Sequence, residues 1–135
     1  MSDDTGRSHN PADAMPFSKH LGVRISKATA EEVFGELDVR EELCTTGGIA
    51  HGGAIMAFAD SIGAIGAFIT LPEGAKGTTT IESKTNFLGP ARAGSKLIGV
   101  SKPVKVGARV SVWLTEISTE DGRKVAMVSQ TQMVL

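Results

Sequence analysis

One long apolar segment dominates this sequence of 135 residues. Between Gly52 and Ile69, only Asp60 and Ser61 carry polar side chains. A helix that is apolar on nearly every face belongs in the interior of a fold. Burying an ionised carboxylate inside such a helix is costly unless the carboxylate has partners or a chemical role. The segment therefore predicts a buried core helix and marks Asp60 as a candidate catalytic residue.

The same segment is close to the roughly 20 apolar residues that a transmembrane helix needs. Three features argue against a membrane span: the central Asp60, the many Ala and Gly residues, and the lack of a flanking Lys/Arg cluster. We therefore expect the segment to be the core of a globular domain that has no membrane partner.

Composition narrows the class of protein. The length fits a single domain over residues 1–135, with residues 1–10 flexible. The formal net charge of −1 gives no basic surface for nucleic acid. Cys44 is the only cysteine, which excludes an internal disulfide and fits a reducing compartment. The polar, acidic start resembles neither a signal peptide nor a mitochondrial presequence, so we expect a cytoplasmic protein.

The pattern of apolar residues predicts an α+β fold in which an antiparallel sheet of five or six strands is wrapped around the long helix. A short helix is expected at residues 11–21, where Pro11 can occupy the first helical position. Four strands joined as a meander are expected after the long helix, because their connections are short. The predicted strands are residues 23–28, 32–39, 78–88, 95–106, 108–118 and 124–135.

Two features of this arrangement predict a dimer. The long helix is too apolar to leave one side in water, and the sheet has free edges whose backbone groups lack partners. A second copy of the chain would cover both.

The sequence before the helix, GGIAHGG at residues 47–53, is turn-like and can leave backbone N–H groups free for a ligand.

This glycine-rich segment, followed by AFADS at residues 57–61, resembles the signature of hotdog-fold acyl-CoA thioesterases, the 4-hydroxybenzoyl-CoA thioesterase family with its phenylacetate-degradation branch. Residues 112–117 (VWLTEI) are particularly similar to bacterial 1,4-dihydroxy-2-naphthoyl-CoA thioesterases. The likeness extends over about residues 20–135 and includes TIE at 80–82, NFLGPARAG at 86–94, SKPV at 101–104, GAR at 107–109 and DGR at 121–123. The hotdog fold that this resemblance implies, a curved sheet around one helix, agrees with the periodicity.

Thioester hydrolysis needs a donor for the developing oxyanion and an activated attacking group. The N–H groups of Gly52 and Gly53 lie at a predicted helix N-terminus and are candidate donors, with no side chain in the way of the acyl group. Asp60 is then a general base or a nucleophile, and the sequence leaves both open. Ser61 is not expected to be the nucleophile, because the sequence around it has neither a nucleophile elbow nor a positioned base.

Helix geometry separates these groups within one chain. Asp60 comes nine residues after His51, which is roughly 13 Å along a helix at 1.5 Å per residue. Both groups must approach one thioester to within about 3 Å. If they act together, the acid must come from a second subunit, which agrees with the shared dimer site and the homotetramers that the family implies.

The family resemblance implies further site residues. His51 is expected to orient the turn or the acyl carbonyl, and Thr80 to orient water. Thr45 stands where many relatives have Asn or Gln, and Ala64 where some have Ser or Thr, so Thr45 is a candidate to hold the attacking water.

Substrate contacts are predicted in two groups. An acyl pocket, for an aryl or medium-chain group, is expected beside Asp60, where Ala64 leaves space; its candidate walls are Met56, Phe58, Phe68 and Phe87. Coenzyme A is part of the substrate, and no separate cofactor or metal is expected. Its phosphates need basic residues. The candidates are Lys84, Arg92, Lys102, Lys105 and Arg109, together with the turn residues Gly107 and Ala108.

Two other functions remain open on the sequence. An enoyl-thioester hydratase of the same fold has an acid shortly before a histidine, a pattern that is absent here. A non-catalytic acyl-CoA sensor would not need Asp60, and it usually carries a DNA-binding segment, for which the first 20 residues are too short and too acidic.

Overall fold

The computed structural model describes residues 9–135, which form one six-stranded antiparallel sheet, a two-stranded hairpin and one long helix. The elements in chain order are η2 (Pro11–Ala14), α1 (Pro16–Leu21), β1 (Arg24–Ala28), β2 (Val33–Asp38), η3 (Glu41–Leu43), β3 (Cys44–Thr45), β4 (Ile49–Ala50), α2 (Gly52–Ile69), β5 (Thr78–Phe87), β6 (Lys96–Val106), β7 (Val110–Thr119) and β8 (Lys124–Val134).

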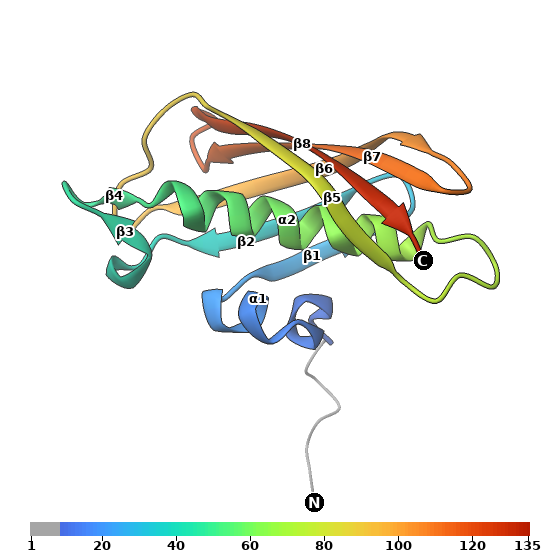
Figure 1. Ribbon diagram of the computed structural model, residues 1–135. Helices are drawn as coiled ribbons and strands as arrows, with labels where there is room; N and C mark the ends of the chain where they lie inside the picture. Colours follow the sequence, from blue (N-terminus) through green and yellow to red (C-terminus); the bar gives the residue numbers. More distant parts are fainter. Residues whose placement is uncertain (1–8) are drawn as a thin grey trace, which may run out of the picture.

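The apolar segment forms α2, and the sheet curves over it (Figure 1). By length and composition α2 is the one helix of the described chain that could cross a membrane. It is instead the core helix, in contact with β1, β2 and β5–β8. Phe58 and Ile62 are fully buried against the sheet, where Gly99 gives them room: a Cβ there would lie 2.6 Å from Ile62. The α+β prediction is confirmed.

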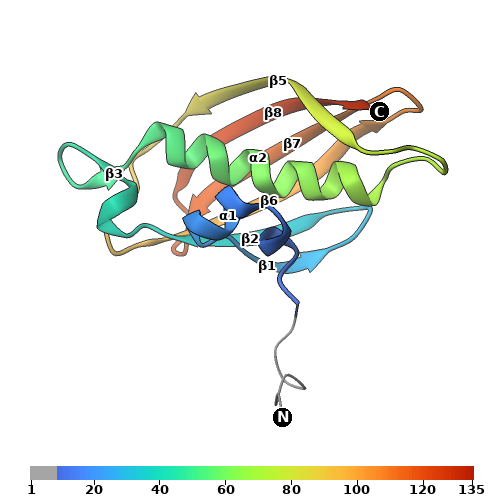
Figure 2. The same ribbon diagram turned by 60° about the horizontal axis from the view of Figure 1, so that its bottom comes forward.

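The strand order is β1-β2-β6-β7-β8-β5 (Figure 2). The predicted four-strand meander is right for β6, β7 and β8 but wrong for β5. β5 pairs with β8 at the far edge of the sheet, on the opposite side of α2 from β1 and β2. Residues 88–95 therefore cross the molecule to reach β6. Short connections favour sequential pairing, but they do not exclude a crossover of eight residues around the end of a helix.

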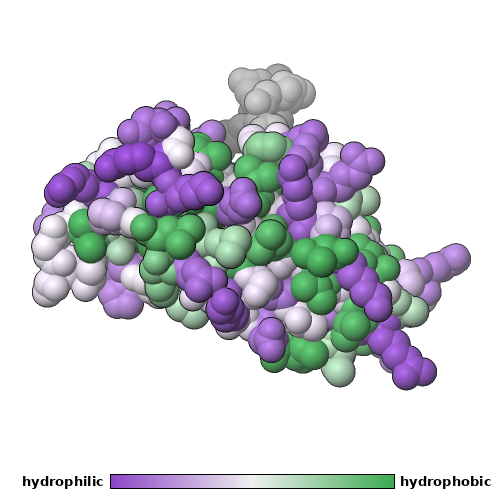
Figure 3. Space-filling model, turned by 90° about the horizontal axis from the view of Figure 1, so that it is seen from above, coloured by the Kyte–Doolittle hydropathy of each residue, from purple (hydrophilic) through white to green (hydrophobic). Residues whose placement is uncertain are grey.

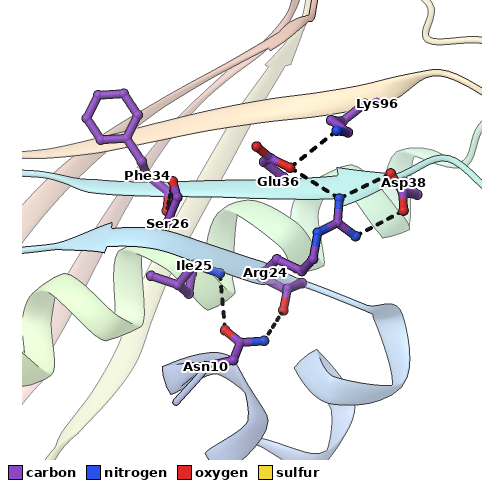
Figure 4. Close-up of polar contacts among 9 residues, drawn as sticks. Asn10, Arg24, Ile25, Ser26, Phe34, Glu36, Asp38 and Lys96 are labelled. Carbon is purple, nitrogen blue, oxygen red and sulfur yellow. Dashed lines mark hydrogen bonds and ion pairs between the residues drawn. The ribbon is translucent and has the colours of Figure 1, made fainter. Parts of the chain in front are cut away.

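In place of the predicted single helix at residues 11–21, the structure has two short helices, the 3-10 helix η2 and the α-helix α1. Pro16 disfavours helical backbone at Met15, which is extended with φ −103° and ψ 108°. Residues 1–8, most of the segment predicted to be flexible, lie outside the described residues. Asn10, at the end of that segment, is held in place: its side chain donates to the Val23 carbonyl (2.8 Å) and accepts from the Ile25 N–H (3.1 Å) (Figure 4).

The glycine-rich lead-in to α2 is a short β3–β4 hairpin, which periodicity did not predict because each strand has two residues. Gly47 (φ 89°) and Gly48 (φ 71°) form its turn with left-handed backbone that other residues rarely adopt. The hairpin ends at Ala50, so the chain enters α2 directly at His51.

The outer face of the sheet carries apolar side chains among polar ones (Figure 3). The alternation along β6, β7 and β8 sends these residues away from α2, and they are half-buried or exposed in the single chain. They are Ile98, Val100, Val110, Val112, Leu114, Met127 and Met133.

On the same side of β1 and β2, Arg24 bridges two carboxylates (Figure 4). Its guanidinium lies 2.9 Å from Asp38 and 3.2 Å from Glu36, and Lys96 lies 3.5 Å from Glu36. The hydrogen bond from Arg24 holds the pKa of Asp38 below its ordinary value of 3.8.

A depressed carboxylate pKa stabilises the fold above the unfolded-state pKa, and the contribution is lost as pH falls through the folded-state pKa. We expect Asp38→Asn to lower the free energy of unfolding by at most about 1 kcal/mol at pH 7, because the pair is exposed. The difference in Tm from the unaltered chain, a few degrees at most, should shrink as the pH falls below 3.8, through the lowered folded-state pKa of Asp38. Thermal melts of both proteins at pH 7 and pH 3 check this, and an equal difference at both values would contradict it.

Candidate active site

The sheet leaves one face of α2 uncovered. The residues on this face recur at three- and four-residue intervals, the spacing of one side of a helix. They are the exposed Gly53, Met56, Asp60 and Phe68 and the half-buried Ala57 and Ala64. Asp60 therefore lies on the open face of the core helix, beside two small side chains.

Asp60 has a single hydrogen-bonding partner in the described chain. The Thr80 hydroxyl on β5 donates to its Oδ1 at 3.1 Å. No ion pair among residues 9–135 includes Asp60. A carboxylate with one oxygen held by a neutral donor and the other free is suited to act as a base or a nucleophile.

His51 caps the N-terminus of α2. Its Nδ1 accepts a hydrogen bond from the Gly53 N–H at 2.8 Å, so the neutral imidazole carries its proton on Nε2. This contact changes the prediction that both glycines serve as donors, because the Gly53 N–H already has an acceptor. Among residues 9–135, the Gly52 N–H donates no hydrogen bond. Gly52 is therefore the free donor of this helix terminus.

A pocket of about 470 Å³ opens beside Gly52. The ring of Phe87 packs over this glycine, where a Cβ would lie 3.1 Å from Phe87 Cζ. Thr45 lies in the wall of the same pocket. Its other walls are Ile49, Ala50, Ile55 and residues 88–91.

A second pocket, of about 690 Å³, lies at the other end of α2 and is mostly apolar. Ala64 lines it one helical turn beyond Asp60, and Phe68 lines it one turn further on. Residues of the N-terminal segment form the opposite wall, and Thr78 closes it from β5. Of the other predicted acyl-pocket residues, Met56 lines neither pocket and Phe58 is fully buried in the core.

Asp60 and Gly52 are not brought together within one chain. Both lie on α2, eight residues apart, which is roughly 12 Å along the helix axis. The two pockets likewise lie at opposite ends of α2. Within one chain, Asp60 and the Gly52 N–H therefore cannot both approach the same carbonyl group.

The predicted basic residues are separated in the same way. Arg92 is exposed, and its backbone forms an isolated antiparallel β-bridge with Ile49, near the N-terminus of α2. Lys105, Gly107, Ala108 and Arg109 belong to the β6–β7 hairpin, at the other end of the sheet. In the described chain Arg92, Lys105 and Arg109 form no ion pair, whereas Lys102 is 4.0 Å from Glu32 and Lys84 donates to Asn86. No three potential metal ligands cluster within residues 9–135.

Two parts of this region were not predicted from the sequence. The N-terminal wall of the apolar pocket, with Pro11, Ala14 and Met15, has no motif. Gln132, which donates to Thr80 at 2.6 Å, lies on a strand whose period-two pattern places it inside. A glutamine at a position that the strand pattern places in the core is a signal in the sequence that could have identified this contact.

A curved antiparallel sheet wrapped around one helix, with a carboxylate on the open face of that helix, defines the hotdog class of thioesterase folds. Residues 47–126 match the model of the Thioesterase superfamily, and the chain belongs to this family. It is an enzyme with thioesterase activity.

Similar proteins support the same assignment. The 1,4-dihydroxy-2-naphthoyl-CoA thioesterase 2 of Arabidopsis thaliana is 30% identical over 121 residues, which cover 87% of this chain and 76% of the relative. The 1,4-dihydroxy-2-naphthoyl-CoA hydrolase of Escherichia coli is 35% identical over 88 residues, 65% of this chain and 63% of that protein. The crystal structure of thioesterase HI1161 from Haemophilus influenzae superimposes with a TM-score of 0.80 at 27% identity, covering 87% of this chain and 80% of the other.

Proposed function

We propose that this protein hydrolyses the thioester of an aryl- or medium-chain acyl-CoA to the free acid and CoA, with Asp60 as the general base or nucleophile. One observation carries the proposal: Asp60 lies on the open face of the core helix, held at one oxygen by Thr80 and paired with no cation of the described chain. Membership of the thioesterase family and the similarity to two naphthoyl-CoA thioesterases support the substrate class.

The chemistry follows two routes that use the same groups. As a general base, Asp60 takes a proton from water while the water oxygen bonds to the thioester carbon, and the carbonyl electrons move onto oxygen. The Gly52 N–H of a second copy donates to that oxyanion. The electrons then return, the carbon–sulfur bond breaks, and the thiolate takes the proton from Asp60. As a nucleophile, Asp60 bonds to the carbon itself and expels the thiolate, and water hydrolyses the resulting anhydride.

A second copy is needed because one chain separates the acid from the donor. β5 is the natural contact: it is an edge strand, and most of its residues are exposed, on both faces. Two β5 edges that pair antiparallel would continue the sheet and bring the open face of each α2 towards the other copy. Such a dimer has two equivalent sites. The apolar outer face of the sheet is consistent with pairs of dimers, and the tetramer stays a prediction.

The apolar pocket beside Ala64 suits the acyl group. It begins one helical turn from Asp60, and its volume of about 690 Å³ exceeds the needs of an acetyl group. Its wall includes Met15, whose unbranched side chain adapts to different shapes. Asn10 fixes this wall through its hydrogen bonds to β1 and the residue before it.

A hydrolysis screen tests the proposal. Release of free thiol is measured for benzoyl-, hydroxybenzoyl-, naphthoyl-, phenylacetyl- and straight-chain acyl-CoA, with the unaltered chain and with Asp60→Asn. Turnover of at least one of these esters that depends on Asp60 supports the proposal. Binding without turnover would favour an acyl-CoA sensor, and hydration of an enoyl-CoA without thiol release would favour a hydratase; either result contradicts it.

Filling the apolar pocket should change selectivity. Ala64→Phe adds a ring where the pocket approaches Asp60, and overfilling a site typically costs about 1–3 kcal/mol. We expect the ratio of kcat/KM for the preferred long or aryl ester to that for acetyl-CoA to fall about tenfold or more. The matched control is Ala30→Phe in the exposed β1–β2 turn, which should leave the ratio unchanged. An unchanged ratio in Ala64→Phe would place the acyl group elsewhere.

A further inference from the structure

A line of three polar side chains runs from the buried interior to the open face of α2. Gln132 on β8 is 1% exposed, and its Nε2 lies 2.6 Å from Thr80 Oγ1. Thr80 Oγ1 in turn lies 3.1 Å from Asp60 Oδ1. Thr80 and Gln132 are directly opposite each other in the β5–β8 ladder, so both point to the same side of the sheet.

The chemistry of these groups gives the line a direction. An amide nitrogen only donates, so Gln132 Nε2 must occupy a lone pair of the Thr80 oxygen. A hydroxyl has one proton, and the Thr80 proton is then free to point to Asp60. With the amide reversed, Gln132 Oε1 would take that proton and leave the lone pairs of Thr80 facing the carboxylate. A carboxylate oxygen only accepts, and Asp60 Oδ1 lies 3.1 Å from Thr80 Oγ1, so this contact needs the Thr80 proton and favours the first orientation. Thr78 Oγ1 lies 3.0 Å from both Gln132 Oε1 and the Met133 carbonyl, so its single proton has two acceptors.

The local backbone keeps this line rigid at its inner end. Burying a glutamine is costly unless its polar atoms are paired, and here both are. The register of β5 against β8 shifts between Thr80 and Glu82, and a bulge of this kind turns a side chain to a particular direction.

Gln130 provides the contrast. It lies on the same strand and the same inner face, is also 1% exposed, and packs on Gly63 of α2. Neither of its polar atoms has a hydrogen-bonding partner in the described part of the chain. Burial of a glutamine on β8 therefore does not by itself produce the contact with Thr80.

We propose that Gln132 is a positioning residue for catalysis: it sets the direction of the Thr80 hydroxyl so that this hydroxyl donates to Asp60 Oδ1 and leaves Oδ2 for the substrate or water. This inference rests on the proposed role of Asp60. It adds a residue of the last strand, without contact to the substrate, to the determinants of kcat.

A double-mutant cycle tests the inference, with thiol release on the best ester as the measurement. Gln132→Met keeps the volume and removes the donor, and we expect kcat to fall about tenfold, with KM within about twofold, as for loss of a hydrogen bond that supports a charged group. Thr80→Val should lower kcat at least as much, and Thr80→Ser should restore most of it. If Gln132 acts through Thr80, adding Gln132→Met to Thr80→Val should change kcat less than twofold.

Gln130→Met is the matched control and should leave kcat unchanged. Should Gln132→Met fail to fold, Thr78→Val removes the hydroxyl that lies 3.0 Å from both Gln132 Oε1 and the Met133 carbonyl, and it should still lower kcat about threefold. Independent, multiplying effects of Gln132→Met and Thr80→Val, or an unchanged kcat in Gln132→Met or Thr78→Val, would overturn the inference while an inactive Asp60→Asn still supports the proposed function. No thiol release by the unaltered chain would overturn both.

Discussion

Asp60→Asn is expected to lower kcat for acyl-CoA hydrolysis by about 10³-fold, within the range that a positioned general base contributes. The change removes the negative charge that takes a proton or attacks carbon, in either route. Asparagine keeps the size of the side chain, and its carbonyl oxygen can still accept the hydrogen bond from Thr80. Because Asp60 is exposed and forms no ion pair in the described chain, we expect the melting temperature and KM to stay close to their original values.

Asp121→Asn is the matched control, since Asp121 is an exposed aspartate of the β7–β8 turn, with Thr119 and Arg123 as its partners. This variant should keep full kcat. Steady-state kinetics over a range of ester concentrations separates the two parameters. If Asp60→Asn retains more than about a tenth of the original kcat, Asp60 has no chemical role at this site.

Much of the fold could be predicted because burial leaves a periodic pattern. The long apolar segment predicted α2 at its observed bounds, and the alternation around Leu37 predicted the inner face of β2. Ala64 was expected beside Asp60, and the two lie one helical turn apart on the face of α2 that the sheet leaves open. These predictions depend only on contacts between a segment and the core.

Features that depend on distant segments or on a side-chain rotamer could not be predicted in this way. The pairing of β5 with β8 depends on the path of the chain around α2, and the local sequence pattern does not encode that path. The capping of Gly53 by His51 depends on a rotamer, and the Gln132–Thr80 contact depends on the register between two strands. The site residues that were predicted came mainly from the family resemblance, whereas these contacts required the structure.

Gly52→Pro is expected to lower kcat by about 10²–10³-fold, because it deletes one N–H, the free donor at the N-terminus of α2. Gly52 is the first residue of the helix, where proline is well tolerated. His51 before it is already extended, with φ −64° and ψ 136°, as a residue before proline should be. The matched control is Gly52→Ala, which adds the same Cβ near Phe87 and keeps the N–H. Equal kcat in the two variants would exclude this N–H as the oxyanion donor.

The two inactive variants together test whether the site is shared between chains. In a mixed dimer of Asp60→Asn and Gly52→Pro chains, one site carries both defects, and the other combines an intact Asp60 with an intact Gly52 from the opposite copy. Random reassociation of equal amounts gives mixed dimers in about half of the population, so about a quarter of the original activity should return. If each site drew its acid and its donor from the same chain, every site in the mixture would carry one defect and no activity would return. Recovery of activity on mixing, measured after subunit exchange, therefore distinguishes a shared site from two separate ones. We expect recovery because Asp60 and Gly52 lie roughly 12 Å apart along α2 and cannot act on one thioester within the same chain.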